Sequence, residues 1–196
     1  MEKINFIKTF IPQGDFREKY EHGGMMVRHL AAVLDEKMGA YECYECTVPI
    51  GEYDEGEIQK AFVEFTAKMD ALKLEQAKAD KIADITAYDT SSSVNGFILN
   101  GMLVWLDKAT RVGLMNSTTI AKAAGQKTTT LWLGGIRLVV DCDKAIQLLS
   151  ALEMYALDCF NVTASHKQAV SELTTIEEVE AYDYKAGYPK MLEMSV

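Results

Sequence analysis

The sequence predicts an α+β protein, and the main evidence is one local pattern that occurs twice. Two apolar, β-prone runs flank a two-residue turn that favours positive φ, first around Asn100-Gly101 and again around Gly134-Gly135. An aspartate that can cap a helix follows each pair of runs, at Asp107 and Asp141. We therefore predict two β-hairpin-plus-helix units in the second half of the chain.

The composition is that of a folded, acidic chain. Its 196 residues are 48% hydrophobic, which is enough to bury a core. The formal net charge of −9 is spread along the chain and argues against a nucleic-acid partner. The N-terminus has no basic-then-apolar leader, and no uncharged apolar run approaches the ~18 residues of a membrane span. We expect a protein without a signal peptide, without a membrane partner, and without a disulfide scaffold, because four cysteines are too few.

Changes of pattern divide the chain into three parts. Residues 1–54 are expected to form a small N-terminal α+β unit, with a strand at 4–11, a helix at 25–37 and a strand at 41–50. Residues 55–87 contain no glycine after Gly56 and no proline, which predicts one long connecting helix. The C-terminal α+β domain then covers residues 88–196.

The long helix carries a candidate self-association seam. Its apolar residues recur at alternating steps of four and three, which is typical of a helix that packs against a partner helix. The helix could join two domains or begin a short coiled coil between chains, and a homo-oligomer is the resulting expectation. The seam residues are Ile58, Phe62, Phe65, Met69 and Leu72.

The C-terminal domain is expected to surround one buried helix. The segment 142–160 is apolar on nearly every side and is predicted to be that central helix. Thr175 and Glu178 have the spacing of a capping box at the start of a short helical turn. The other expected elements are a polar turn at 90–93, a helix at 107–124, a more polar helix at 163–173 and a strand at 190–196.

Cys43 and Cys46 form the one motif with the spacing of a redox or zinc site. They fall in a predicted strand, where positions three apart point to opposite faces, so their sulfurs are not expected to converge. Cys142 and Cys159 add no second short spacing, although a structural zinc needs four ligands. We predict ordinary packed cysteines, with no metal and no cofactor.

The three histidines, His22, His29 and His166, are far apart in the sequence. A Cys/His nucleophilic pair meets only in the fold, and no local signature supports one here. The paired carboxylates have a structural explanation in the first turns of helices, where negative charge is favourable. No catalytic residue is therefore assigned.

Two further pairs of residues are candidates for a surface role or for packing. Trp105 and Trp132 occupy matching places in the two hairpins and could form a surface platform, but core packing is the favoured interpretation. Asp107 and Arg111 are four residues apart on a predicted helix and can pair there, which gives them a structural explanation as well.

Three segments resemble an uncharacterised domain family. They are KIADITAYDTSSSVN at 81–95, WLDKATRVGL at 105–114 and EVEAYDYKAGYP at 178–189. The family is found in gut-bacterial phages and prophages, where it usually forms the C-terminal part of proteins encoded among tail and tail-fibre genes. The resemblance covers about residues 75–196. It implies a virion-associated or tail-assembly role, in the bacterial host cytoplasm during assembly or in the virion, and it supplies no catalytic or ligand residues.

Three functions compete at this point. The first is a non-enzymatic phage or prophage protein, either a tail or tail-fibre-associated component or an assembly factor, that acts through contacts with other protein chains or itself. The second is a host-directed protein-binding or inhibitor module. The third is an enzyme or metal protein that uses Cys43, Cys46 or a histidine.

Overall fold

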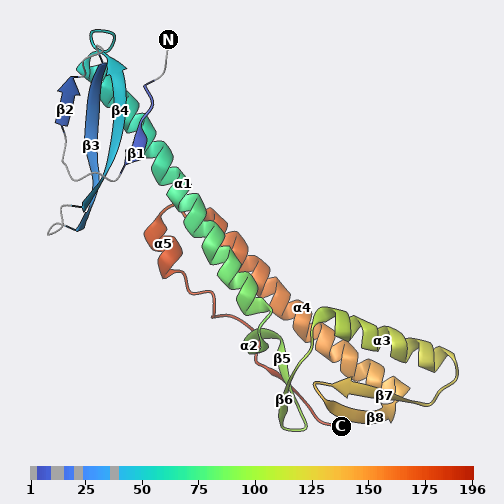
Figure 1. The fold of residues 1–196 in the computed structure, drawn as a ribbon. Helices are drawn as coiled ribbons and strands as arrows, with labels where there is room; N and C mark the ends of the chain where they lie inside the picture. The colour runs from blue at the N-terminus through green and yellow to red at the C-terminus, as the bar shows by residue number, and fades with distance from the viewer. Residues whose placement is uncertain (1–3, 10–15, 20–23, 36–39) are drawn as a thin grey trace. The chain divides into compact units, whose positions relative to one another are not determined.

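The computed structural model describes residues 4–9, 16–19, 24–35 and 40–196. The chain divides into two compact units, residues 1–73 and 74–196. The boundary lies inside the long helix α1 (Glu55–Asp89), so each unit contains one part of that helix (Figure 1). Helices and strands occur together in the chain, which confirms the predicted α+β class.

The first unit is built on a four-stranded antiparallel sheet with the strand order β1-β4-β3-β2. The strand predicted at 41–50 is confirmed as β4. The strand predicted at 4–11 is confirmed in part as β1, because residues 10 and 11 lie outside the described residues. The bounds are β1 Ile7–Thr9, β2 Phe16–Lys19, β3 Gly24–Asp35 and β4 Ala40–Pro49.

The helix predicted at 25–37 is wrong, because the segment 24–35 is the strand β3. β3 pairs with β4 along its length, with Met25 opposite Val48. The register shifts twice, between Leu30 and Ala32 and again between Val33 and Asp35. Such irregularities interrupt the two-residue alternation by which a strand is recognised in a sequence. Residues 24–35 therefore form a strand because they pair with β4, and this pairing is not visible in the local sequence.

The core of the first unit lies between this sheet and the first turns of α1. Phe6, Val27, Tyr44 and Val48 from the sheet side form one apolar cluster with Ile58 of α1. Aromatic rings extend the contact, and the ring centroids of Phe6 and Phe62 lie 5.2 Å apart while those of Tyr44 and Phe65 lie 4.9 Å apart.

The second unit contains both predicted hairpins, and the two hairpins belong to separate sheets. One sheet has the order β6-β5-β9, with β9 parallel to β5, and the other contains β7 and β8 alone. The bounds are α2 Ser92–Asn95, β5 Gly96–Leu99, β6 Met102–Trp105, α3 Lys108–Ala123, β7 Thr128–Leu133, β8 Ile136–Asp141, α4 Cys142–Glu172, α5 Ile176–Ala181 and β9 Leu192–Met194.

Local signals in this unit are confirmed. Asn100 and Gly101 have φ of 50° and 82°, and Gly134 and Gly135 have φ of 58° and 88°, as a hairpin with a primed turn requires. Asp107 and Asp141 are the N-caps of α3 and α4. The capping box formed by Thr175 and Glu178 opens α5. The strand predicted at 190–196 is shorter and runs over β9, and the turn predicted at 90–93 partly overlaps the short helix α2.

The central helix differs from its prediction in two respects. The two helices predicted at 142–160 and 163–173 are one continuous helix, α4, because no proline or glycine separates them. In addition, α4 is not buried on every side. Ala145, Leu149, Leu152, Tyr155 and Cys159 face the core, whereas the large apolar side chains of Met154, Leu157 and Phe160 are exposed.

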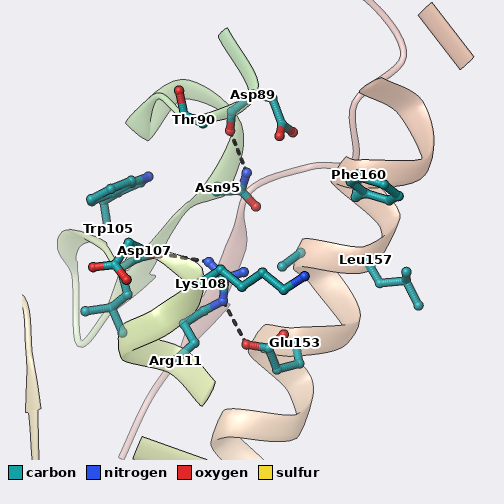
Figure 2. Close-up of a pocket in the computed structure, with 12 residues that line it drawn as sticks. Asp89, Thr90, Asn95, Trp105, Asp107, Lys108, Arg111, Glu153, Leu157 and Phe160 are labelled. Atoms are coloured by element: carbon teal, nitrogen blue, oxygen red, sulfur yellow. Dashed lines mark hydrogen bonds and ion pairs between the residues drawn. The ribbon is translucent and has the colours of Figure 1, made fainter. Parts of the chain in front are cut away.

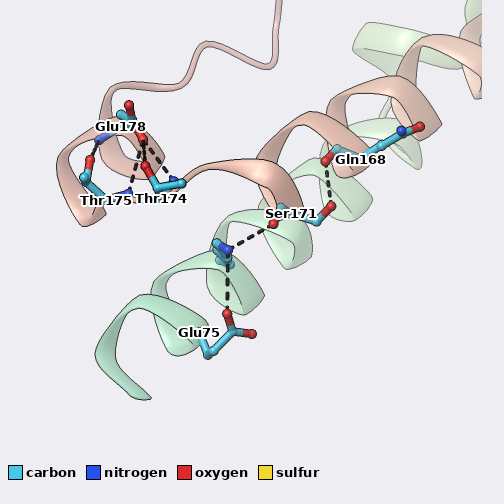
Figure 3. Close-up of polar contacts among 7 residues, drawn as sticks. Glu75, Gln168, Ser171, Thr174, Thr175 and Glu178 are labelled. Atoms are coloured by element: carbon cyan, nitrogen blue, oxygen red, sulfur yellow. Dashed lines mark hydrogen bonds and ion pairs between the residues drawn. The ribbon is translucent and has the colours of Figure 1, made fainter. Parts of the chain in front are cut away.

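Polar contacts fix the part of α1 that belongs to the second unit. Lys78 Nζ donates a hydrogen bond of 3.0 Å to the backbone carbonyl oxygen of Ser171 on α4 and lies 3.6 Å from Glu75 Oε1 (Figure 3). A small apolar cluster also joins α1, α4 and α5 and contains Ile85, Val170 and Val179. These contacts position the C-terminal end of α1 beside α4, where the candidate site lies.

Candidate functional site

A pocket of about 420 Å³ opens in the second unit, where the end of α1, the loop before α3 and the middle of α4 meet (Figure 2). Its volume falls within the range of small-ligand and side-chain binding pockets. The lining residues are Asp89, Thr90, Asn95, Trp105, Leu106, Asp107, Lys108, Arg111, Glu153, Ala156, Leu157 and Phe160.

Trp105 stands at the mouth of this pocket because of the alternation of β6. Val104 is buried, so the side chain of Trp105 emerges on the other face of the strand and is 40% exposed. The matching Trp132 is 59% exposed on β7, between the buried Leu131 and Leu133, and it does not line the pocket. The favoured interpretation of both tryptophans as core residues is therefore wrong.

Asp107 and Arg111 both line the pocket, but each bonds to another residue instead of forming the ion pair that their spacing allows. Asp107 turns back onto its own helix, where Oδ1 accepts from the backbone N–H of Thr110 at 2.8 Å and Oδ2 accepts from the Thr110 hydroxyl at 2.7 Å. These two hydrogen bonds hold the pKa of Asp107 below its ordinary value.

Arg111 instead joins α3 to α4. Its Nε donates to Glu153 Oε1 at 2.8 Å, and its Nη1 donates to the backbone carbonyl oxygen of Leu106 at 2.8 Å. Arg111 is only 8% exposed, and its ion pair with Glu153 forms a charged wall of the pocket.

The opposite wall is held by the end of α1. Asp89 Oδ1 accepts a hydrogen bond of 2.7 Å from the hydroxyl of Thr163 on α4. Asn95 Nδ2 donates to the backbone carbonyl oxygen of Asp89 at 2.6 Å. Thr163 is buried and also lies 2.8 Å from the hydroxyl of Tyr188, so Asp89 belongs to a network that includes the C-terminal segment.

The apolar part of the pocket comes from α4 and was not predicted from the sequence. Leu157 and Phe160 are 48% and 59% exposed, and both line the pocket. Met154 continues the same exposed stripe three residues earlier. The available signal was the excess of apolar residues in 142–160, which is larger than one buried helix face can accommodate.

The predicted seam of α1 lies in the first unit. Ile58 is buried, and Phe62 and Phe65 are half-buried against the chain's own sheet. Met69 is half-buried, and Leu72 is 54% exposed. The first three seam residues are thus covered within the unit, and Leu72 is the seam residue that is most open to a partner.

The cysteines lie apart from the pocket lining. Cys43 and Cys46 are both buried in β4, and Cys43 Sγ lies 3.1 Å from the hydroxyl of Thr9. All four cysteines are free thiols. Among the described residues, no group of three or more histidine, cysteine, aspartate or glutamate side chains converges in a way that could hold a metal ion.

The histidines are not brought together either. His29 stacks on Phe62 in the first unit, with 3.9 Å between ring centroids. In the second unit His166 Nε2 lies 2.9 Å from the carbonyl oxygen of Ala186 and Nδ1 lies 2.8 Å from the hydroxyl of Tyr182. Because a carbonyl only accepts, Nε2 carries the proton of that bond. His22 lies outside the described residues.

No helix in the part of the chain that the structure describes is long and apolar enough to cross a membrane.

The profile of one protein family, described as a domain of unknown function (DUF4376), matches residues 76–186. This range begins two residues after the second unit does and contains every residue that lines the pocket. No curated protein and no solved structure matches the chain.

Proposed function

The chain belongs to the DUF4376 family of domains of unknown function, and we propose that its family domain is a non-enzymatic protein-binding module. The observation that carries the proposal is the exposure of three large apolar side chains, Trp105, Leu157 and Phe160, around one pocket. Contiguous apolar surface with a few polar groups at its edge is typical of protein interaction sites.

The polar groups of the pocket support binding rather than chemistry. Arg111 and Glu153 bond to each other, and the carboxylate of Asp107 caps α3. The lining contains no cysteine or histidine, and the carboxylates of Asp89, Asp107 and Glu153 each accept a hydrogen bond from another residue of the chain. The charged residues therefore shape the pocket and set the polarity of its rim.

For the biological setting we propose a phage or prophage protein, either a tail or tail-fibre-associated component or an assembly factor. The support is the sequence resemblance described above. Two of its three segments also contribute residues to the lining of the pocket. Segment 81–95 supplies Asp89, Thr90 and Asn95, and segment 105–114 supplies Trp105 and Arg111 among others. The module would then act on other protein chains in the host cytoplasm during assembly or in the virion.

The test is direct binding to purified tail and tail-fibre proteins encoded beside this chain, measured by bio-layer interferometry. We expect at least one of them to bind, and we expect Trp105→Ser or Phe160→Ser to weaken that binding by about tenfold or more, as for a central apolar contact. Ile120→Ser is the matched control, because Ile120 is exposed on α3 and does not line the pocket. Absence of binding, or equal weakening by Ile120→Ser, would contradict the proposal.

A further inference from the structure

We propose that the pocket recognises the free carboxylate at the C-terminus of a partner protein whose last residue is apolar. The inference rests on the proposed function and specifies which part of the partner enters the pocket. It is based on the balance between hydrogen-bond donors and acceptors in the lining and on the arrangement of the apolar wall.

The donors of the pocket exceed what the chain itself uses. Arg111 has five N–H groups, and within the described residues its Nε and Nη1 bond to Glu153 and Leu106 while its Nη2 makes no hydrogen bond. Lys108 is exposed at the pocket, and its ammonium has no ion-pair partner among the described residues. Its side chain extends across the pocket in the direction of Leu157 (Figure 2).

The acceptors of the pocket are already occupied in part. Asp107 accepts two hydrogen bonds from Thr110, Asp89 accepts one from Thr163, and Glu153 accepts one from Arg111. An anionic ligand would bond to the donors that these carboxylates leave unused, which are the ammonium of Lys108 and Nη2 of Arg111. Charge-assisted bonds of this kind to a carboxylate are stronger than those between neutral groups.

The apolar wall explains why the carboxylate should belong to an apolar residue. Trp105 on one side and Leu157 and Phe160 on α4 line the same pocket as the two cations (Figure 2). Capture of a C-terminal carboxylate is a recurring mode of peptide recognition, and here the last side chain would lie against the apolar wall.

The same wall favours a polypeptide end over a free small acid. The exposed stripe continues beyond the pocket to Met154, which lies outside the lining. A single small acid inside the pocket would leave Met154 in water, whereas the residues that precede a C-terminus could cover it. We therefore assign the site to a protein partner.

The experiment uses the full chain and short fluorescein-labelled peptides that end in Phe, Leu, Ile or Trp, each with a free carboxylate or with an amide. Fluorescence anisotropy measures the affinity, and circular dichroism checks that each variant is folded. We expect amidation to weaken the best peptide by about tenfold, which is typical of losing a charge-assisted contact. Lys108→Met should weaken the acid peptide and leave the amide unchanged. Lys127→Met is the matched control, since Lys127 is exposed and does not line the pocket.

The remaining outcomes separate the two proposals. If acid and amide bind equally and Phe160→Ser abolishes both, carboxylate recognition is wrong while the protein-binding function stands. Tighter binding of the amides would equally overturn carboxylate recognition. If N-acetylphenylalanine competes at the same concentration as the best peptide, the site belongs to small acids and both proposals fail. If no peptide binds, the inference is overturned, and the tail-protein panel alone then decides the proposed function.

Discussion

At the scale of single residues, Arg111 shows how one side chain can be assigned a partner wrongly from spacing alone. The four-residue helical spacing allows Arg111 to pair with Asp107. However, Asp107 is the N-cap of α3, and its carboxylate accepts hydrogen bonds from Thr110. Arg111 therefore bonds to Glu153, which is forty-two residues away in the sequence. A partner at that distance becomes visible only when α3 and α4 have packed together.

The backbone of Gly101 provides a residue-scale prediction. Gly101 has φ of 82°, and a Cβ added there would meet no atom within 4 Å. Gly101→Val should consequently lower the free energy of unfolding by about 1–3 kcal/mol through backbone strain and not through a clash. Urea unfolding followed by circular dichroism measures the change.

The matched control for this substitution is Gly113→Ala. Gly113 also has nothing within 4 Å of its added Cβ, but it lies inside α3 with an ordinary helical backbone. Alanine should stabilise that helix by about 0.5–1 kcal/mol. If Gly101→Val were neutral while Gly113→Ala behaved as expected, the positive φ at the turn would be contradicted.

At the scale of elements, the short helix α5 depends on a capping box whose carboxylate titrates. Glu178 accepts from the backbone N–H groups of Thr174 and Thr175, and these bonds hold its pKa below the ordinary value of 4.5 (Figure 3). A group whose pKa is lower in the folded state stabilises the protein above its unfolded pKa, and this contribution is lost as the pH falls through the folded pKa.

We therefore expect Glu178→Gln to be slightly less stable than the wild type at neutral pH and equally stable in acid below the folded pKa of Glu178. Thermal unfolding of both proteins, measured from neutral pH down to below the folded pKa of Glu178, tests this difference in stability. Glu177→Gln is the control, because Glu177 lies in the same first turn of α5 and is exposed. A Glu178→Gln deficit that is independent of pH would show that the ionised carboxylate contributes nothing.

The elements also show what the sequence can reveal and what it cannot. The two hairpin turns, the caps of α3 and α4 and the capping box of α5 were predicted because each is encoded within a few neighbouring residues. β3 was missed because its register shifts hide the alternation, and its structure depends on β4.

The candidate site was only partly predictable for the same reason. Trp105, Asp107 and Arg111 were singled out, but their burial and partners follow from strand register and helix packing. The sequence predicts Leu157 and Phe160 as part of a buried helix, because it shows that a helix is apolar but not which of its faces has no neighbour.

At the scale of the whole molecule, each unit has a core of its own. The first part of α1 contributes Ile58 to the core of the first unit, and the last part contributes Ile85 to a cluster in the second. A perturbation near the start of α1 is thus expected to act on the first unit and to spare the second.

The last prediction tests this independence together with self-association through α1. Phe62→Glu places a carboxylate against Phe6 and the sheet, and should destabilise the first unit by about 1–3 kcal/mol, the cost in proteins of desolvating a polar group without a partner, because Phe62 is half-buried there. Leu72→Glu is the matched control on the same helix, because Leu72 is exposed and should leave both units folded. Backbone amide spectra report which unit remains folded, and light scattering reports the molar mass. If Phe62→Glu lowered the molar mass with both units intact, Phe62 would pack between chains and the first unit's core would be contradicted. If Leu72→Glu lowered it, the chains would associate through the exposed end of the seam, and the two cores would remain as described.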